Sequence, residues 1–394
     1  MLSIKHVISI VLRQICFSLC RLVPKEKKLV LCTAWFGQKY IDNPKYVFEF
    51  LLNNSDYKVL WLTRSNGIYK QLKNKGKPVA KFNSLIGIWK QIRAQAIFTT
   101  VQLSEFNSFC ITNVIHIDLG HGHPVKDPGA KSWNKHVFRV EKMYLKHNNF
   151  HAVCSSIFSG EKLLEIIPNM DKTHIHISDM ARNDVFVDKD LQLGKNTIVD
   201  KYKNGLKAIV YMPTHRSDGK SVMHMDELLP LNELQQLCQS NGYVFIIKKH
   251  FYHRNEFEKL EKYPNIYDIT SIDDIDPQVL LCQADILISD YSACYIDYLL
   301  LDRPILFYQY DYDIFQKNER TLYFPFSTLN IAPIAYDKKE LVEKLQDIIM
   351  SPDKFSENRR KFIPTYFANA SQNKGRYKVK LILDKLMDLY YPNN

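Results

Sequence analysis

Polar side chains that could hold or transfer an anionic group follow several predicted strands, at the point where each strand ends. One group is Asp290, Tyr291 and Ser292, directly after the apolar residues 284–289. Apolar residues at helical spacing come next, which predicts a strand–helix–strand unit of a parallel sheet. Ligands of such sheets lie beyond the carboxyl ends of the strands. Ser292 is expected to cap the helix, whose first N–H groups would hold a phosphate. An ordinary strand-to-helix turn is the alternative.

Three further groups follow predicted strands in the same way. His121 lies in a glycine-flanked turn, where it could be a general base, a metal ligand or a plain turn residue. Arg216 follows the strand predicted at 208–212 and offers a planar fork for a phosphate. His250 follows the strand predicted at 243–247, beside two lysines. Together the four groups predict a site for a phosphorylated substrate at the carboxyl ends of the strands.

Strand and helix patterns alternate along the whole chain, which predicts α/β domains. A chain of 394 residues is long enough for two of them. The polar, charged stretch 189–207 predicts the boundary, so we expect an amphipathic segment at 1–24, a first domain at 25–190 and a second at 191–394. The chain contains no GxGxxG or GxxxxGK[ST] motif, which argues against dehydrogenases and P-loop proteins.

Charge and composition indicate the class of partner. Lys and Arg number 53 against 42 Asp and Glu, a net charge of +11. This excess favours phosphate groups or an anionic membrane surface. Nucleic acid ranks lowest, because the sequence shows no nucleic-acid module. The eight cysteines form no CxxC pair, so they are expected to be buried thiols in a reducing compartment and to hold no zinc.

The first 24 residues carry an apolar stripe at helical spacing. Its members are Ile4, Val7, Ile8, Val11, Leu12, Ile15, Leu19 and Leu22. Lys5, Arg13 and Arg21 interrupt the apolar character, so a membrane-spanning helix is not expected. Two interpretations remain: an amphipathic helix lying on an anionic leaflet, and a helix packed on the protein itself.

The order of the motifs resembles that of the CDP-glycerol glycerophosphotransferases, the teichoic-acid primases and polymerases, and related capsule enzymes. In the first half the matching pieces are YIDNPKY at 40–46, His121-Gly122 with Pro124 and Lys126, and ARND at 181–184. In the second half they are PTHR at 213–216, Lys249-His250, SDYS at 289–292 through Asp297 to Arg303-Pro304, and Phe367 with KGR at 374–376.

This resemblance implies a GT-B fold, in which two Rossmann-like domains with parallel sheets face a central cleft. The first domain would be on the acceptor side, and the second would bind the CDP donor. The implied reaction transfers glycerol phosphate from CDP-glycerol to a hydroxyl of a lipid-linked or glycan acceptor and releases CMP. It would serve teichoic-acid or capsule synthesis, with the enzyme peripheral on the cytoplasmic face of the cell membrane.

The resemblance also implies roles for individual residues. His121 would be the base, and His250 with Arg216 would stabilise the phosphate and the leaving group. Donor or phosphate contacts are expected from Thr214, Arg216, Lys249, Asp290, Tyr291, Ser292, Ala293 and Asp297, and further site positions are Gly122, Lys126, Arg182 and Asp184. We expect no resident metal and no tightly bound cofactor, with a loosely held Mg²⁺ on the donor diphosphate still compatible.

Four positions depart from the family pattern and leave the donor open. They are His123 in place of Thr, Phe251 in place of Pro, Ala293 in place of a second Ser, and Ala181 in place of Pro. A ribitol-phosphate or hexose-phosphate transferase with another nucleotide donor is therefore the first alternative. A non-catalytic nucleotide- or glycan-binding protein is the second, although the presence of His121, His250 and Arg216 argues against it.

Overall fold

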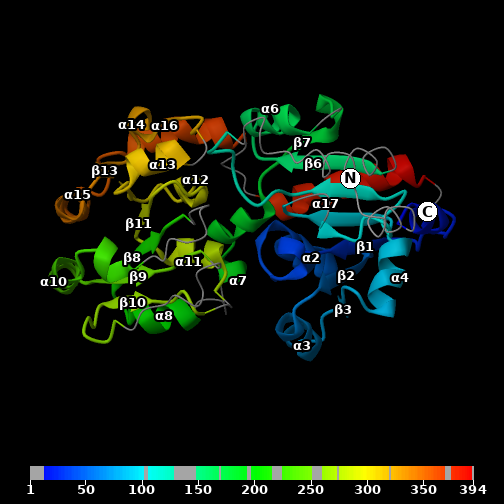
Figure 1. Ribbon diagram of the computed structural model, residues 1–394, viewed down its shortest axis with the longest axis horizontal. Coiled ribbons are helices and arrows are strands. Elements are labelled where there is room, and N and C mark those ends of the chain that lie inside the picture. Colours follow the sequence, from blue (N-terminus) through cyan, green and yellow to red (C-terminus); the bar gives the residue numbers. More distant parts are fainter. Residues whose placement is uncertain are drawn as a thin grey trace, which may run out of the picture. The chain divides into compact units, whose positions relative to one another are not determined.

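In the computed structural model the chain forms two compact α/β units (Figure 1). Unit 1 comprises Met1–His121, Ala130–Asp184 and Ser371–Asn394, and unit 2 comprises Gly122–Gly129 and Val185–Ala370. The structure describes residues 13–101, 105–127, 148–167, 170–192, 197–214, 224–250, 260–272, 275–318, 321–368 and 374–392.

Unit 1 is built on a seven-stranded sheet in which every pairing is parallel. Its strands are β1 (Leu29–Cys32), β2 (Lys58–Thr63), β3 (Val79–Lys81), β4 (Ala96–Thr99), β5 (Ile115–Asp118), β6 (Asn149–Cys154) and β7 (Ile175–Ile177). They lie in the order β3-β2-β1-β4-β5-β6-β7. The strand order reverses between β1 and β4, which makes this pair the topological switch point of the sheet.

Helices accompany the sheet of unit 1, and three of them begin at a serine whose side chain accepts a backbone N–H of the first turn. The helices are α2 (Asp42–Asn54), α3 (Asn66–Asn74), α4 (Leu85–Arg93), α6 (Ile157–Ile166) and α17 (Gly375–Tyr390), with short 3-10 turns η1 (Trp35–Gly37), η4 (Lys172–His174) and η5 (Ala181–Phe186). The inner strands β1, β4, β5 and β6 are almost fully buried, as continuous apolar runs in a parallel sheet require, whereas the edge strands β3 and β7 are only partly buried.

Unit 2 repeats the same arrangement with a six-stranded parallel sheet. Its strands are β8 (Lys207–Met212), β9 (Tyr243–Ile247), β10 (Ile266–Asp268), β11 (Ile286–Ser289), β12 (Ile305–Tyr308) and β13 (Ile334–Ala335). They lie in the order β10-β9-β8-β11-β12-β13, so the switch point lies between β8 and β11.

Ten helices are described in unit 2, and a proline separates two of them. They are α7 (Lys189–Gln192), α8 (Thr197–Lys203), α9 (Met225–Leu228), α10 (Leu231–Asn241), α11 (Pro277–Gln283), α12 (Cys294–Leu299), α13 (Tyr312–Asn318), α14 (Phe326–Leu329), α15 (Lys338–Met350) and α16 (Ser356–Tyr366). Pro230 separates α9 from α10. Proline lacks the N–H that a continuous helix needs at that point.

The last helix, α17, belongs to unit 1, whereas the expected boundaries put residues 191–394 in one domain. It contacts α2 and β5, and its inward face (Val379, Leu383, Leu386 and Met387) is buried. Asp184 fixes its first turn by accepting hydrogen bonds from the backbone N–H of Gly375 (2.7 Å) and from Arg376 Nε (2.8 Å). The sequence shows the helix by its periodicity, but periodicity does not say which sheet covers the apolar face.

The amino-terminal segment is described only from residue 13 onward. Residues 13–20 are helical, with Phe17 buried and Ile15, Leu19 and Leu22 exposed. The first half of the predicted amphipathic stretch lies outside the described residues, so the helix over 1–24 stays a prediction. In the described part of the chain, no helix is long and apolar enough to cross a bilayer.

The close approach of α17 to the start of η5 can be tested at Gly375. A Cβ at this position would lie 2.6 Å from the carbonyl carbon of Met180 and 2.7 Å from the backbone nitrogen of Ala181. We expect Gly375→Ala to lower the free energy of unfolding of unit 1 by about 1–3 kcal/mol, because backbone must move to admit the methyl group. Urea unfolding followed by circular dichroism measures the change.

Gly67→Ala in α3 is the matched control, since a Cβ there meets only Ser65 Oγ at 3.7 Å. This variant is expected to be as stable as the parent or more stable by about 0.5–1 kcal/mol. Equal urea midpoints for the two variants would contradict the packing described for α17.

Candidate functional site

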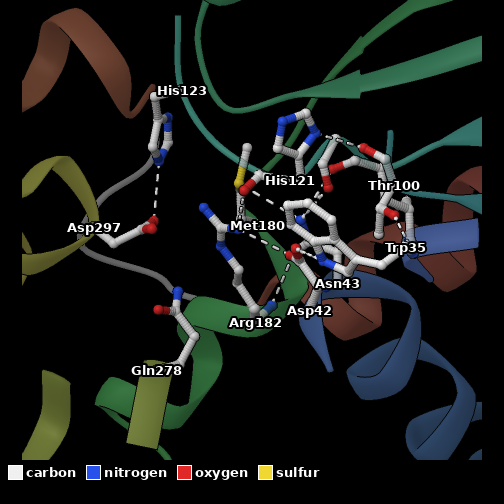
Figure 2. A network of polar contacts seen from close by, with 12 residues as sticks. Trp35, Asp42, Asn43, Thr100, His121, His123, Met180, Arg182, Gln278 and Asp297 are labelled. Carbon is white, nitrogen blue, oxygen red and sulfur yellow. Dashed lines mark hydrogen bonds and ion pairs between the residues drawn. The ribbon is translucent and has the colours of Figure 1, made fainter. Parts of the chain in front are cut away.

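In unit 1, His121 is held by a hydrogen bond that sets the proton on its ring. The residue follows β5 at the carboxyl edge of the sheet and is exposed. Its Nδ1 lies 2.9 Å from the carbonyl oxygen of Thr100, and Figure 2 shows Trp35 beside the ring, with ring centroids 5.3 Å apart. A carbonyl can only accept, so the neutral ring carries its proton on Nδ1 and its lone pair on Nε2. The imidazole is therefore set up to take a proton at Nε2.

The backbone that leads into His121 is fixed by buried side chains of the two motifs at 40–46 and 181–184. Asn43 Nδ2 donates to the carbonyl oxygens of Leu119 and Gly120, both at 3.0 Å. Arg182 Nη1 donates to the carbonyl oxygen of His121 at 2.6 Å and pairs with Asp42 Oδ1 at 2.9 Å (Figure 2). Three successive carbonyls are thus held, which gives the histidine one orientation.

The turn after β1 is strained and lies against the same histidine. Trp35 (φ 51°), Phe36 (φ 55°) and Gly37 (φ 76°) are all left-handed, a conformation that the first two residues rarely adopt. The Trp35 N–H donates to Thr100 Oγ1 at 3.2 Å, which joins the ends of β1 and β4 across the switch point. Backbone strain of this kind is typical of functional sites.

Asp184, predicted near the site, has a different role in the structure. Its carboxylate is buried and accepts from Gly375 and Arg376 at the start of α17. Burial raises the pKa of this carboxyl, and the hydrogen bonds from Arg376 act in the opposite direction. Asp184 therefore anchors the terminal helix.

In unit 2, Asp290 joins two strand ends at the switch point. It follows β11, is fully buried, and accepts from the backbone N–H of Thr214 (2.9 Å) and from Thr214 Oγ1 (2.6 Å), which follows β8. His250 follows β9, the neighbour of β8, and is half-buried. Two of the predicted groups, Asp290 with its neighbours and His250, therefore share the carboxyl edge of this sheet, while His121 follows a strand of the sheet in unit 1.

The predicted helix cap at Ser292 is displaced by one residue. The N-cap of α12 is Ala293, which provides no side-chain cap, and Ser292 Oγ accepts from the N–H of Cys294 at 3.4 Å. The helix has six residues, so it carries a small dipole. A Cβ on Gly122 would lie 3.7 Å from the Cβ of Ala293, which places these two small residues next to each other.

Two of the predicted phosphate contacts are buried among other side chains of unit 2. Lys249 Nζ lies 3.6 Å from Asp268 Oδ2, and both side chains are inaccessible to solvent. The Tyr291 ring stacks on Phe315 with centroids 3.5 Å apart, and its hydroxyl donates to Asp311 Oδ1. These contacts account for the burial of both residues, and their role toward a donor stays a prediction.

His123, which departs from the family pattern, also has a partner within unit 2. His123 Nε2 lies 3.0 Å from Asp297 Oδ1, with both side chains buried (Figure 2), and its ring contacts Phe367. Lys126 pairs with Leu322 in an isolated bridge, and its Nζ lies over the Phe315 ring. Arg216 and the rest of residues 215–223 lie outside the described residues.

Sequence reasoning missed four residues around His121. They are Trp35, Asn43, Thr100 and Glu105. Asn43 had a signal, since it lies inside the motif at 40–46, but Thr100 acts through its carbonyl and Glu105 belongs to no motif. Among the described residues, no cluster of three His, Cys, Asp or Glu side chains could hold a metal ion.

Known proteins are similar to this sequence over most of its length. A family model for CDP-glycerol:poly(glycerophosphate) glycerophosphotransferases matches residues 15–384. The teichoic acid poly(glycerol phosphate) polymerase of Bacillus spizizenii is 26% identical over 352 residues, which are 84% of this chain and 86% of that protein. The teichoic acid glycerol-phosphate transferase of Staphylococcus aureus is 24% identical over 385 residues, 91% of this chain and 94% of that protein.

The fold agrees with that of a solved relative. The wall teichoic acid polymerase TagF superposes on this chain with a TM-score of 0.76 at 22% sequence identity. The superposition covers 98% of this chain and 97% of the TagF chain. The two doubly wound units therefore form a TagF-like GT-B fold, as the motif order implied. With the family model matching nearly the whole sequence, the chain belongs to the CDP-glycerol:poly(glycerophosphate) glycerophosphotransferase family.

Proposed function

We propose that this chain transfers glycerol phosphate from CDP-glycerol to a hydroxyl of a lipid-linked or glycan acceptor in teichoic-acid synthesis, with release of CMP. The observation that carries the proposal is the hydrogen bond between His121 Nδ1 and the Thr100 carbonyl. It leaves a basic lone pair on Nε2 of an exposed histidine, at the sheet edge where doubly wound folds bind their ligands. Membership of the family supplies the donor class.

In this mechanism the acceptor oxygen attacks the phosphorus that bears glycerol. His121 Nε2 takes the hydroxyl proton as the new P–O bond forms, and the bond to CMP breaks with its electron pair on the CMP oxygen. The negative charge that develops there needs fixed positive partners, since charge stabilisation and positioning dominate phosphoryl transfer. We assign this role to His250 and Arg216, with the Ser292 hydroxyl on the donor phosphate.

The hydrogen bonds from Thr214 to the Asp290 carboxylate hold the ends of β8 and β11 together, which supports a rigid donor-binding edge in unit 2. No tightly bound cofactor is part of the proposal, and a Mg²⁺ ion would enter loosely held on the donor diphosphate. Family membership favours glycerol phosphate as the transferred group, and the departure from the family pattern at His123 has a buried partner in Asp297. Ribitol phosphate remains the alternative, since Ala293 is a second departure.

CMP release measures the reaction directly. With a lipid-linked glycan acceptor we expect CMP from CDP-glycerol, and much less from CDP-ribitol or UDP-sugars. His121→Ala should lower kcat by about 10²–10⁴-fold, the usual contribution of a general base. His250→Ala should also lower kcat, because a cationic partner of the leaving group is lost.

His174→Ala is the control, since His174 at the end of η4 pairs with Asp171, the N-cap residue of that turn. Its activity should equal that of the parent. The proposal would be abandoned if no CDP-polyol gave CMP, and the role of His121 would be abandoned if His121→Ala kept the parent kcat.

We further propose that the protein works as a peripheral enzyme on the anionic, cytoplasmic face of the membrane. Two exposed apolar stripes of unit 1 support this: Ile15, Leu19 and Leu22 at the amino terminus, and Leu85, Ile86 and Trp89 on α4. In the second stripe Leu85 is 89% exposed, and Trp89 has the guanidinium of Arg93 over its ring. A tryptophan beside cationic and aliphatic side chains is typical of membrane-interface surfaces.

Vesicle sedimentation tests the contribution of α4. Leu85→Ser with Trp89→Ser should weaken binding to phosphatidylglycerol-containing vesicles by tenfold or more, because burying each large apolar side chain contributes about 1.5–3 kcal/mol. Binding of the parent should also fall as salt rises. Ile157→Ser, an exposed apolar position on α6, is the control that should bind as the parent does. Unchanged binding of the double variant, or equal binding to neutral vesicles, would contradict the proposal.

A further inference from the structure

Glu105 is a buried carboxylate that belongs to no motif. It contacts Thr100, and Thr100 in turn contacts His121. Its side chain has no solvent exposure. Four donors surround it: the backbone N–H groups of Phe36 (2.9 Å), Thr100 (2.6 Å) and Val101 (3.1 Å), and the Thr100 hydroxyl (2.9 Å). Burial raises the pKa of this carboxyl, and the four hydrogen bonds oppose the shift.

These four hydrogen bonds require a carboxylate at this position. Every partner is a donor, and an ionised carboxyl accepts on both oxygens. An amide of the same shape would turn an N–H group toward at least one of these donors. A donor that loses its acceptor in a buried place destabilises the arrangement by about 1–3 kcal/mol.

Thr100 connects this carboxylate to the base. Its N–H and hydroxyl are bound by Glu105, while its carbonyl oxygen accepts the Nδ1–H of His121. The same carboxylate also holds the N–H of Phe36, in the strained turn that packs beside the histidine. Glu105 thus ties the ends of β1 and β4 together at the point where the His121 ring rests.

We infer that Glu105 is a positioning residue for the transfer reaction: it holds the Thr100 carbonyl against His121 Nδ1 and so keeps the basic lone pair on Nε2. The inference rests on the proposed role of His121 as base. When Nε2 takes the acceptor proton, the Nδ1–H to carbonyl hydrogen bond becomes charge-assisted and stronger. A loosened Thr100 would therefore make His121 a weaker base as well as a less well oriented one.

Glu105→Gln gives this inference a kinetic test. We expect kcat to fall by about 10–100-fold, since small misplacements of a catalytic group have effects of this size. The KM for CDP-glycerol should change less than about threefold, because a positioning defect acts on the chemical step. The acid limb of the pH profile of kcat should move to lower pH, because the Thr100 carbonyl that accepts the Nδ1–H of the imidazolium is held less firmly.

The other charged groups around His121 stay in place in this variant. They are Asp118 on β5 and the pair formed by Asp42 and Arg182. Glu26→Gln is the matched control in the same unit: Glu26 precedes β1 at the opposite edge of the sheet and pairs with Lys90. It should keep the parent kcat and the parent acid limb. A carboxylate that only stabilised the fold would leave the acid limb of Glu105→Gln at the parent pH, which would overturn the inference.

A double variant separates this inference from the proposed function. If Glu105 acts through His121, Glu105→Gln should cause no further loss of kcat in the His121→Ala background. A further loss as large as in the parent background would overturn the inference and leave the role of His121 intact. Full activity of His121→Ala alone would instead contradict the proposed function.

If Glu105→Gln does not give folded protein, Thr100→Val provides the same readout. It removes the hydroxyl that donates to Glu105 and accepts from Trp35 but keeps the backbone carbonyl. A shift of the acid limb to lower pH, smaller than for a lost carboxylate, supports the inference. An unmoved limb with normal thermal stability contradicts it.

Discussion

One hydrogen bond, from the Nδ1–H of His121 to the carbonyl oxygen of Thr100, decides how unit 1 can take part in chemistry. An imidazole in water exchanges its proton between both nitrogens, and only a fixed acceptor on one side makes the other nitrogen a dependable base. The surrounding network keeps that acceptor in place. Asn43 and Arg182 hold the backbone that leads into the histidine, and Glu105 holds Thr100. All three are buried, where an unmet polar group is unfavourable, so the arrangement has little freedom to relax.

The two units have the same kind of polar contact at the switch point of their sheets. Each is a doubly wound parallel sheet, and in each the strand ends on either side of the switch point are joined by a threonine. In unit 1 the Thr100 hydroxyl accepts the N–H of Trp35 across β1 and β4. In unit 2 Thr214 donates to Asp290 across β8 and β11. A polar tie at this point is compatible with ligand binding, because the loops beyond it remain at the carboxyl edge. Unit 1 thereby presents the exposed His121, and unit 2 presents the half-buried His250.

Much of this could be predicted from local patterns, and the rest depended on contacts between distant residues. Apolar runs predicted the strands of both sheets except the two-residue β13, and the placement of His121, His250 and Asp290 after strand ends is confirmed. Asn43, Thr100 and Glu105 could not be identified as a network, because the contacts that join Asn43 to Leu119, Thr100 to His121 and Glu105 to Phe36 connect residues far apart in the sequence. The cap at Ser292 was misplaced because one residue separates the strand-to-helix turn from the N-cap. The position of α17 on the sheet of unit 1 was not predicted either, because its contacts with α2 and β5 also connect residues far apart in the sequence.

The tautomer of His121 is the most direct measure of the central claim. In protein labelled with ¹⁵N-histidine, comparison with His121→Ala assigns the ring signals, and their shifts report which nitrogen carries the proton. Above the titration range of the ring, the account predicts a protonated Nδ1 and an unprotonated Nε2 for His121. A neutral ring with its proton on Nε2 would contradict it, because the nitrogen assigned as the base would then have no lone pair to use.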